Sequence, residues 1–147
     1  MSEYYLNQGL PKPVASPDGL DGPFWEAAQQ GILKLQKCRG CNKFQWGPEW
    51  ICHRCHSFDL GFEEVEATGT IYSYERVWHP VHPALKDQGA YLVVLVELPH
   101  ADQVRMVGNL VGDAEQHVVI GSEVQAVFEH HPDDDPSHTL VNWALSQ

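Results

Sequence analysis

Cys38-Arg-Gly-Cys41 and Cys52-His-Arg-Cys55 are the two segments of the sequence that decide the fold. Each segment places two cysteines three positions apart, and ten residues separate the segments. A Cys-x-x-Cys segment forms a tight turn that points both sulfurs at one ion, and two such turns supply the four thiolates that zinc prefers in a tetrahedral shell. The spacing therefore predicts a zinc ribbon over residues 32–61, built from two facing hairpins that share one zinc ion per chain.

The predicted zinc is structural, because four cysteines fill a tetrahedral shell and leave no position for a substrate. Two other uses of the cysteines stay open. An iron ion in the same four-sulfur shell would make the chain an electron carrier, whereas a dithiol redox pair is disfavoured by the second identical segment. His53 and His56 flank the second segment and are expected to be solvent-exposed neighbours of the site.

The overall composition narrows the class of protein. The chain has 147 residues, of which 43% are hydrophobic, and a formal net charge of −11. This length fits one ordinary domain or two very small ones, and the acidic charge argues against generic nucleic-acid binding. The sequence shows neither an apolar run of about 20 residues nor a signal-peptide layout. We therefore expect no membrane contact and a cytoplasmic location, where cysteines favour metal ions over disulfides.

Residues 1–31 are predicted to form an extended arm followed by a short helix. Three prolines and two glycines interrupt residues 1–20, which favours a polyproline-like arm, either a frayed tail or a strap that orders on a partner. In the helix, Asp21 is expected to cap the start, Pro23 to occupy the first turn and Gly31 to end the element.

From residue 62 onward the sequence predicts a β barrel, so that the fold class is mainly β. Short runs rich in β-branched and aromatic residues alternate there with Gly, Pro and Asp. Five or six strands in about 85 residues fit an OB-type barrel over residues 62–147, and the nearly continuous apolar run at 91–98 is expected to be a central strand. The predicted strands of this region are 62–66, 70–78, 91–98, 104–110, 123–129 and 138–145. Turns are predicted at 68–69 and 133–136, and a loop at 84–90. A further half-buried strand is predicted from residue 33, ahead of the cysteine region.

Basic residues concentrate in the cysteine region of this otherwise acidic chain. Residues 34–54 hold five of the nine basic residues and one of the 20 acidic ones. One explanation is charge balance, because four thiolates and one dication leave a negative net charge that nearby cations stabilise. The other explanation is a patch that grips a phosphorylated ligand. The five residues are Lys34, Lys37, Arg39, Lys43 and Arg54.

The sequence shows no recognisable catalytic constellation. Nine histidines are scattered through the chain, but there is no HExxH spacing, no Gly-x-Ser-x-Gly elbow and no glycine-rich phosphate loop. His79 and His82 form at most a weak metal pair and are expected to lie at the tip of a polar loop. These observations favour a binding or accessory role and predict that the chain is not itself an enzyme.

A family resemblance is carried by four stretches in a fixed order. They are Pro23-Phe-Trp-Glu26, Gly31-Ile-Leu-Lys-Leu-Gln-Lys-Cys-Arg-Gly-Cys41, Cys52-His-Arg-Cys55-His-Ser-Phe-Asp-Leu60 and Gly69-Thr-Ile-Tyr-Ser-Tyr74. Over about residues 20–130, the chain resembles the zinc-ribbon plus OB-fold accessory proteins of acyl-CoA metabolism, domain-of-unknown-function family thirty-five. The ordered combination is more specific than either cysteine pair alone.

The resemblance implies an N-terminal helical segment, a rubredoxin-like four-cysteine zinc ribbon and a C-terminal OB-fold barrel. It also implies a non-catalytic subunit in a hetero-oligomer with a thiolase-superfamily enzyme: a thiolase, a thiolase-like aldolase or an acyl-CoA-forming synthase. Such a subunit helps to bind or channel an acyl-CoA thioester, at or near the shared interface, in degradation of an aromatic, steroid or fatty acyl chain. The metal ligands that the resemblance implies are Cys38, Cys41, Cys52 and Cys55.

Two sets of residues are expected to serve this accessory role. The five basic residues within residues 34–54 are candidate contacts for the phosphates of coenzyme A. Large aromatic residues of the helix and the ribbon edge are candidate contacts for the catalytic partner. These partner-contact candidates are Phe24, Trp25, Phe44, Trp46 and Trp50.

The alternative function is binding of single-stranded nucleic acid. Zinc ribbons and OB barrels both occur in such proteins, and Tyr72, Tyr74 and Trp78 are candidates for stacking on bases. Stacking binders also need a positive groove for the nucleic-acid backbone, whereas the chain from residue 62 onward is acidic. This alternative is therefore weaker than the accessory role, and the iron-bearing electron carrier stands as a second alternative.

Overall fold

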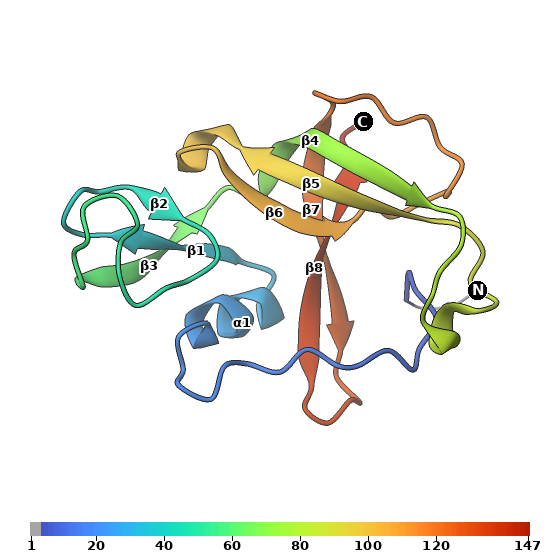
Figure 1. Ribbon diagram of the computed structural model, residues 1–147, viewed down its shortest axis with the longest axis horizontal. Helices are drawn as coiled ribbons and strands as arrows, with labels where there is room; N and C mark the ends of the chain where they lie inside the picture. The colour runs from blue at the N-terminus through green and yellow to red at the C-terminus, as the bar shows by residue number, and fades with distance from the viewer. Residues whose placement is uncertain (1–3) are drawn as a thin grey trace.

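The computed structural model describes residues 4–147, which form one helix and two antiparallel β-sheets. The three-stranded sheet has the order β2-β1-β3, and the five-stranded sheet has the order β6-β5-β4-β7-β8 (Figure 1). The small sheet lies at one end of the molecule, beside the helix (Figure 1). Within the described part of the chain, no helix is long and apolar enough to span a bilayer. The mainly β fold class predicted from sequence is confirmed.

The helix α1 (Gly22–Gln29) confirms the predicted element, with Pro23 in its first turn and Gly31 in the left-handed region (φ 72°) just beyond its end. Asp21 occupies the N-cap position, as predicted, but its side chain makes no cap hydrogen bond. Its carboxylate instead accepts hydrogen bonds from Ser16 N (2.7 Å) and Trp25 Nε1 (3.1 Å). Asp21 therefore ties the end of the N-terminal arm to the helix.

The small sheet carries the first cysteine segment. Its central strand β1 (Leu33–Cys38) pairs with β2 (Phe44–Gln45) on one side and with β3 (Leu60–Val65) on the other. The sequence assigns residues 62–66 to the barrel, but β3 pairs along its whole length with β1. Only two residues separate β3 from β4, so the chain passes directly from the ribbon sheet into the barrel.

The five-stranded sheet forms a nearly closed OB-fold barrel, as predicted. A parallel bridge between Leu110, just after β6, and Trp143 of β8 brings the two edge strands together. The predicted central strand is confirmed, because β5 is paired with β4 on one side and β6 on the other. The barrel strands are β4 (Thr68–Val77), β5 (Tyr91–Leu98), β6 (Val104–Asn109), β7 (Glu123–His131) and β8 (His138–Leu145), with short 3-10 helices η1 (Pro83–Leu85) and η2 (Pro99–Ala101).

A single hydrophobic core runs from the ribbon sheet into the barrel. Leu33 and Leu35 of β1 and Phe24 of α1 belong to the same buried cluster as the interior of the barrel. Trp143 of β8 is the largest fully buried side chain of that cluster. The ribbon and the barrel are therefore packed as one body.

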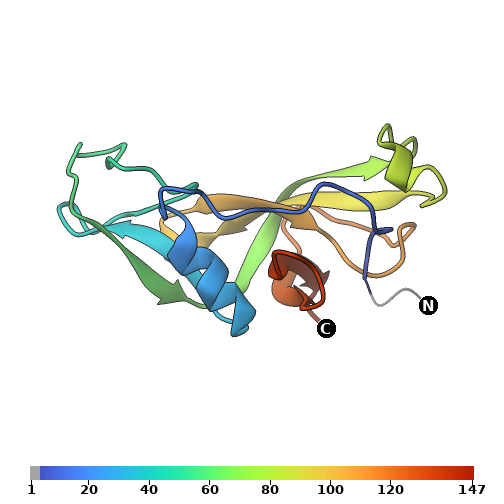
Figure 2. The same cartoon turned by 90° about the horizontal axis from the view of Figure 1, so that it is seen from below.

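The N-terminal arm docks on its own barrel, along which it runs in Figure 2. Leu92 N donates to the Tyr5 hydroxyl (3.0 Å), Tyr5 N donates to Glu129 Oε2 (2.9 Å), and Lys12 forms an ion pair with Asp134 (2.9 Å). The described arm is thus neither a frayed tail nor a strap that waits for a partner. Residues 1–3 of the predicted arm lie outside the described residues.

The turn predicted at Thr68-Gly69 is wrong, because both residues lie inside β4. Gly69 is buried and pairs with Val124 of β7. A Cβ atom at this position would lie 2.6 Å from the backbone oxygen of Glu97, which is far closer than van der Waals contact. Glycine is required here because two strands approach closely, a need that the sequence alone does not distinguish from a turn.

We expect Gly69→Ala to destabilise the fold by about 1–3 kcal/mol, because the added methyl group would push β4 away from β5. Gly22→Ala is the matched control, since no atom lies within 4 Å of a Cβ placed at Gly22. Its effect should stay within about 0.5 kcal/mol. Denaturant unfolding of the two variants measures the difference, and equal stability would contradict the close-approach explanation.

Candidate metal centre

The four cysteine sulfurs converge at one point of the ribbon. The Sγ atoms of Cys38 and Cys55 are 3.6 Å apart, and those of Cys41 and Cys52 are 3.7 Å apart. All four sulfurs lie within 4.8 Å of one another, and none forms a disulfide. A tetrahedral ion with metal–sulfur bonds of about 2.3 Å holds its sulfurs about 3.8 Å apart. The cluster therefore has the dimensions of a four-thiolate metal site.

The backbone around each cysteine pair is arranged to support negative sulfur. Cys41 N points at the Sγ of Cys38 (3.5 Å), and Arg54 N points at the Sγ of Cys52 (3.4 Å). The two turns are also closed by matching backbone hydrogen bonds, since Cys38 N donates to Lys43 O and Cys52 N donates to Ser57 O, both at 2.9 Å. Amide groups directed at sulfur favour the thiolate form that a metal ion needs.

The thiols at the centre differ strongly in acidity. Backbone hydrogen bonding, first from Cys55, lowers the pKa of Cys52 to about 6, whereas burial raises the pKa of Cys41 to about 12. Such a difference in pKa is expected for neighbouring thiols, because the negative charge of one thiolate raises the pKa of the thiol beside it. A bound dication removes that conflict and favours all four thiolates together.

Two buried glutamines hold the loop between the cysteine pairs in place. Gln45 Nε2 donates to Gln36 Oε1 (2.7 Å), and Gln36 exchanges two hydrogen bonds with the backbone of Glu49 (both 2.9 Å). Gln45 also accepts from His53 N (3.1 Å), which fixes the start of the second cysteine turn. Sequence reasoning missed this network, because Gln36 occupies an alternating polar position of β1 that is normally exposed.

Asp102 joins the ribbon to the barrel. It follows η2 in the left-handed region (φ 53°), and its carboxylate accepts from Phe44 N (2.9 Å) and pairs with Lys43 Nζ (3.0 Å). These contacts, the Phe44 hydrogen bond first, lower the pKa of Asp102 below its ordinary value. The sequence showed no signal for this role, since the contact spans 58 positions of the chain.

Three of the five basic candidates for phosphate contacts are already paired with acidic side chains. Among the described residues, no carboxylate lies within ion-pair distance of Lys34 or Arg54. The five side chains therefore do not form one unpaired basic cluster. The three ion pairs are Lys37–Glu63 (2.9 Å), Arg39–Asp59 (3.0 Å) and Lys43–Asp102 (3.0 Å).

The five aromatic candidates for partner contacts fall into two groups. Phe24 and Phe44 are buried, so their side chains serve the chain's own packing. Trp25 and Trp46 are half-buried and pack around Phe24, with ring centroids 5.1 Å and 4.7 Å from its ring. Trp50 is 58% exposed and is therefore available to a partner.

Sequence reasoning missed Phe58, which is 78% exposed and lies on the same groove as Trp50. The groove has a volume of about 370 Å³ and is also lined by Leu20, Pro23 and Phe62. Trp50 Nε1 donates to Asp18 Oδ2 (3.1 Å), which positions the indole ring at the rim. Gln36, Arg39 and Glu49 also line the groove. A mixed groove with two exposed aromatic rings is typical of a docking surface for a protein.

The flanking histidines are placed outside the sulfur cluster. His53 and His56 are exposed and are not among the residues that converge there. His79 is exposed too, and His82 Nδ1 accepts from Ala84 N (3.1 Å) at the start of η1. In the described part of the chain, neither His79 nor His82 belongs to a group of residues that could hold a metal ion.

The fold and the sulfur cluster define a class of protein, a four-cysteine zinc ribbon joined to an OB-fold barrel. Two family models match the chain in that order: the rubredoxin-like zinc ribbon domain of ChsH2 over residues 25–61, and the C-terminal OB-fold domain of ChsH2 over residues 62–129. The chain belongs to the ChsH2 family of DUF35 proteins. The resemblance noted in the sequence is thereby confirmed.

Two curated proteins share substantial sequence with the chain. It is 42% identical over 105 residues to a probable enoyl-CoA hydratase alpha subunit of Thermomonospora curvata, a match that covers 71% of this chain and 32% of that protein. The chain thus spans about a third of that relative. It is 30% identical over 103 residues to a DUF35 domain-containing scaffold protein of Methanocaldococcus jannaschii, covering 67% of this chain and 68% of the relative.

Two solved structures share the fold. An Ltp2-ChsH2(DUF35) aldolase matches with a TM-score of 0.74 and 34% identity, covering 91% of this chain and 98% of the matched chain. A DUF35-family protein of unknown function from Sulfolobus solfataricus matches with a TM-score of 0.60 and 14% identity, covering 90% of this chain and 87% of the other. The second match shows the fold alone.

We expect Asp102→Asn to destabilise the protein by about 1 kcal/mol at neutral pH, because it removes a charged hydrogen bond to the ribbon. A carboxyl whose pKa is lowered by folding stabilises the fold above its ordinary pKa, and this contribution is lost as pH falls through the folded value. The difference in unfolding free energy between native chain and variant should therefore shrink below about pH 4.

Denaturant unfolding across pH measures this difference, and effects of acid on the cysteines cancel because both proteins carry them. Asp59→Asn is the control, since it removes only an exposed ion pair with Arg39 and should change stability little. A destabilisation by Asp102→Asn that stays constant across pH would contradict the ionised-carboxylate link.

Proposed function

We propose that this chain is a non-catalytic accessory subunit of a thiolase-superfamily enzyme, a thiolase or thiolase-like aldolase that processes an acyl-CoA thioester in the cytoplasm. The observation that carries the proposal is the likeness to a DUF35 chain of an Ltp2-ChsH2 aldolase, almost all of which is matched at 34% identity. The name of that aldolase pairs a DUF35 protein with a second component. A relative described as a scaffold protein supports the same kind of role.

We also propose that the ribbon holds one structural zinc ion through Cys38, Cys41, Cys52 and Cys55. The sulfur spacing and the ribbon family model support this assignment. A four-thiolate shell has no open position for chemistry, so the ion's role is to hold the two cysteine turns together. The ribbon then presents a rigid edge to a partner.

Loss of one ligand tests the zinc assignment. We expect Cys41→Ser to bind much less than one zinc ion per chain and to lose the ribbon fold, because structural zinc contributes on the order of 10 kcal/mol to folding. His53→Ala, which removes an exposed neighbour outside the sulfur cluster, should keep its zinc. Elemental analysis and thermal melting measure both effects. A Cys41→Ser protein with full zinc and an unchanged melting temperature would refute the assignment. Iron instead of zinc in the native chain would favour the alternative function, an electron carrier.

The proposed docking surface is the groove that carries Trp50 and Phe58. Both rings are exposed, whereas the buried candidates Phe24 and Phe44 position the helix and ribbon beneath. The basic residues around the ribbon are the proposed contacts for coenzyme A phosphates. Lys34 and Arg54 are the stronger candidates, because the other three already have acidic partners in the chain.

Replacing both exposed rings, Trp50→Ala with Phe58→Ala, should weaken binding to the catalytic partner at least tenfold, as truncation of aromatic anchors usually does. The partner is the thiolase-like protein that co-purifies with the tagged chain from its native host. Val81→Ala is the control, since this side chain is 99% exposed and lies outside the groove. Calorimetry measures affinity, and an acyl-CoA assay compares the partner alone, the chain alone and the complex.

Two results would overturn the proposed function. One is a chain that stays alone when purified from its host, with no acyl-CoA-processing companion. The other is turnover of an acyl-CoA thioester by the purified chain unaided. Unchanged affinity of the double variant would instead reject the groove as the docking surface and leave the accessory role standing.

A second candidate partner is an enoyl-CoA hydratase. The observation that favours it is the 42% identity to part of a longer protein described as a probable enoyl-CoA hydratase alpha subunit. In that relative the matched region sits in the same polypeptide as about twice as much additional sequence. Mass spectrometry of the co-purified protein distinguishes a hydratase from a thiolase-like partner.

A further inference from the structure

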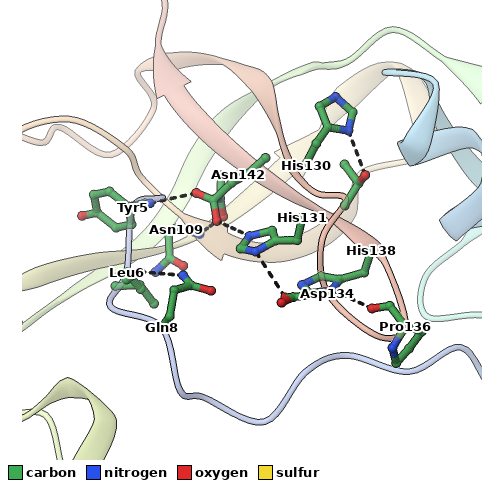
Figure 3. Close-up of polar contacts among 12 residues, drawn as sticks. Tyr5, Leu6, Gln8, Asn109, His130, His131, Asp134, Pro136, His138 and Asn142 are labelled. Carbon is green, nitrogen blue, oxygen red and sulfur yellow. Dashed lines mark hydrogen bonds and ion pairs between the residues drawn. The ribbon is translucent and has the colours of Figure 1, made fainter. Parts of the chain in front are cut away.

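The turn between β7 and β8 gathers two histidines and an aspartate beneath the N-terminal arm (Figure 3). One ring nitrogen each of His131 and His138 and one oxygen of Asp134 lie within 4.8 Å of one another. The Nδ1 atoms of His131 and His138 are 3.6 Å and 3.8 Å from the same oxygen, Oδ2 of Asp134. We call these three residues the hairpin cluster.

The protonation of His131 leaves an unsatisfied lone pair in this cluster. His131 Nε2 lies 2.8 Å from Glu129 Oε1, and because a carboxylate only accepts, Nε2 carries the proton. When the ring carries this one proton alone, Nδ1 is an acceptor. It is buried, has no hydrogen-bond partner among the described residues, and belongs to a side chain that is only 4% exposed.

Two electron-rich atoms of the cluster, His131 Nδ1 and Asp134 Oδ2, lie 3.6 Å apart, with the His131 side chain buried and that of Asp134 half-buried. His138 Nδ1 lies 3.8 Å from the same oxygen and 3.4 Å from Pro136 O, and because a carbonyl only accepts, this nitrogen carries the proton of its ring. Without a positive charge between them, the two electron-rich atoms repel, and burial makes that repulsion stronger. Either a proton or a metal ion has to occupy this position.

We propose that the hairpin cluster binds a divalent transition-metal ion, such as Zn²⁺, through His131 Nδ1, Asp134 Oδ2 and His138 Nδ1. Imidazole and carboxylate together suit zinc and its neighbours in the first transition row. Metal bonds of about 2.1 Å in a tetrahedral shell place donor atoms about 3.4 Å apart. The observed 3.6 Å and 3.8 Å are close to that spacing.

The surroundings of His131 match those of a metal-binding histidine. Such a ring usually donates its other N–H to a carboxylate, which fixes its tautomer and raises its basicity. Here Glu129 Oε1 accepts from His131 Nε2. The other oxygen of Glu129, Oε2, accepts hydrogen bonds from Tyr5 N (2.9 Å) and Asn142 Nδ2 (3.3 Å). Tyr4 stacks on the His131 ring with centroids 4.0 Å apart.

One adjustment is needed for both rings to bind the same ion. The His131 and His138 rings are nearly parallel, at 11° with centroids 4.5 Å apart, whereas imidazole lone pairs lie in the ring plane. His138 is the ring that turns, because its Nδ1 makes only one long hydrogen bond, 3.4 Å to Pro136 O. On binding the ion, the His138 proton moves from Nδ1 to Nε2, which frees the Nδ1 lone pair. His131 is held by Glu129 and keeps its orientation.

The charges and the space around the cluster also suit a cation. Glu129 and Asp134 carry two carboxylates at the cluster, and Lys12 carries one positive charge. Lys12 pairs with Oδ1 of Asp134 (2.9 Å), so Oδ2 remains beside the histidines. The cluster borders a cavity of about 580 Å³ between the arm and the barrel. This cavity has room for a water as a fourth ligand.

The site is tested on the full chain with its ribbon metal in place, so that the outcome does not depend on the proposed partner. Zn²⁺ is titrated by calorimetry after the ribbon is loaded, and bound metal is counted by elemental analysis. We expect one additional equivalent in the native chain and at least a tenfold weaker additional site in His131→Ala and in Asp134→Asn. His130→Ala is the matched control, because this exposed neighbour bonds Thr139 and lies outside the cluster.

Cobalt distinguishes the two sites directly. In the ribbon, Co²⁺ should show intense sulfur-to-metal absorption, whereas the hairpin cluster should add only weak bands of a nitrogen and oxygen shell, absent from the two cluster variants. If His131→Ala fails to fold, the metal affinity of Asp134→Asn, a variant at the half-buried turn, tests the proposal without it. A native chain that binds no additional ion, or additional binding that both variants retain, would overturn the proposal and leave a proton between His131 Nδ1 and Asp134 Oδ2.

Discussion

The convergence of four sulfurs is the constraint on which the ribbon depends. The ribbon sheet has one two-residue strand, and its buried apolar residues Leu33, Leu35 and Phe44 belong to the core that it shares with the barrel. The ribbon therefore has no separate core to order the two cysteine turns. Sulfur atoms at 3.6–3.7 Å bring mutual repulsion unless a cation lies between them. A metal ion at this point would hold the two cysteine turns together, and the hydrogen bonds of Gln36 and Gln45 fix the intervening loop.

That order reaches the barrel through a small number of polar links. Asp102 ties the barrel to β2 by a charged hydrogen bond, while Phe24 and β1 continue the same apolar core. The arm adds a third link, because Lys12 and Tyr5 fasten it to the far side of the β7–β8 hairpin. Ribbon, helix, arm and barrel thus hold one another in place, and Figure 2 shows the arm passing from the helix along the barrel.

Local patterns predicted most of the fold, and tertiary placement accounts for what they missed. Cysteine spacing and strand alternation act between near neighbours, so the ribbon, α1 and the barrel strands could be predicted. Gly69 was misassigned because a turn and a close strand approach both require glycine. Gln36 and Asp102 make contacts that arise only in the folded chain, and nothing in their local sequence distinguishes them from ordinary polar residues. His131 lies close in sequence to Asp134 and His138, but its stacking on Tyr4 depends on the docked arm.

The distribution of charge limits how the ribbon can meet coenzyme A. Four thiolates and one dication would leave the ribbon negative, which explains why cations gather there in an acidic chain. Three of these five cations form ion pairs with carboxylates of the chain. A phosphate would have to displace Glu63, Asp59 or Asp102 to reach them. Charge balance therefore accounts for most of the asymmetry, and under the proposed function phosphate recognition would fall to Lys34, Arg54 and side chains of the catalytic partner.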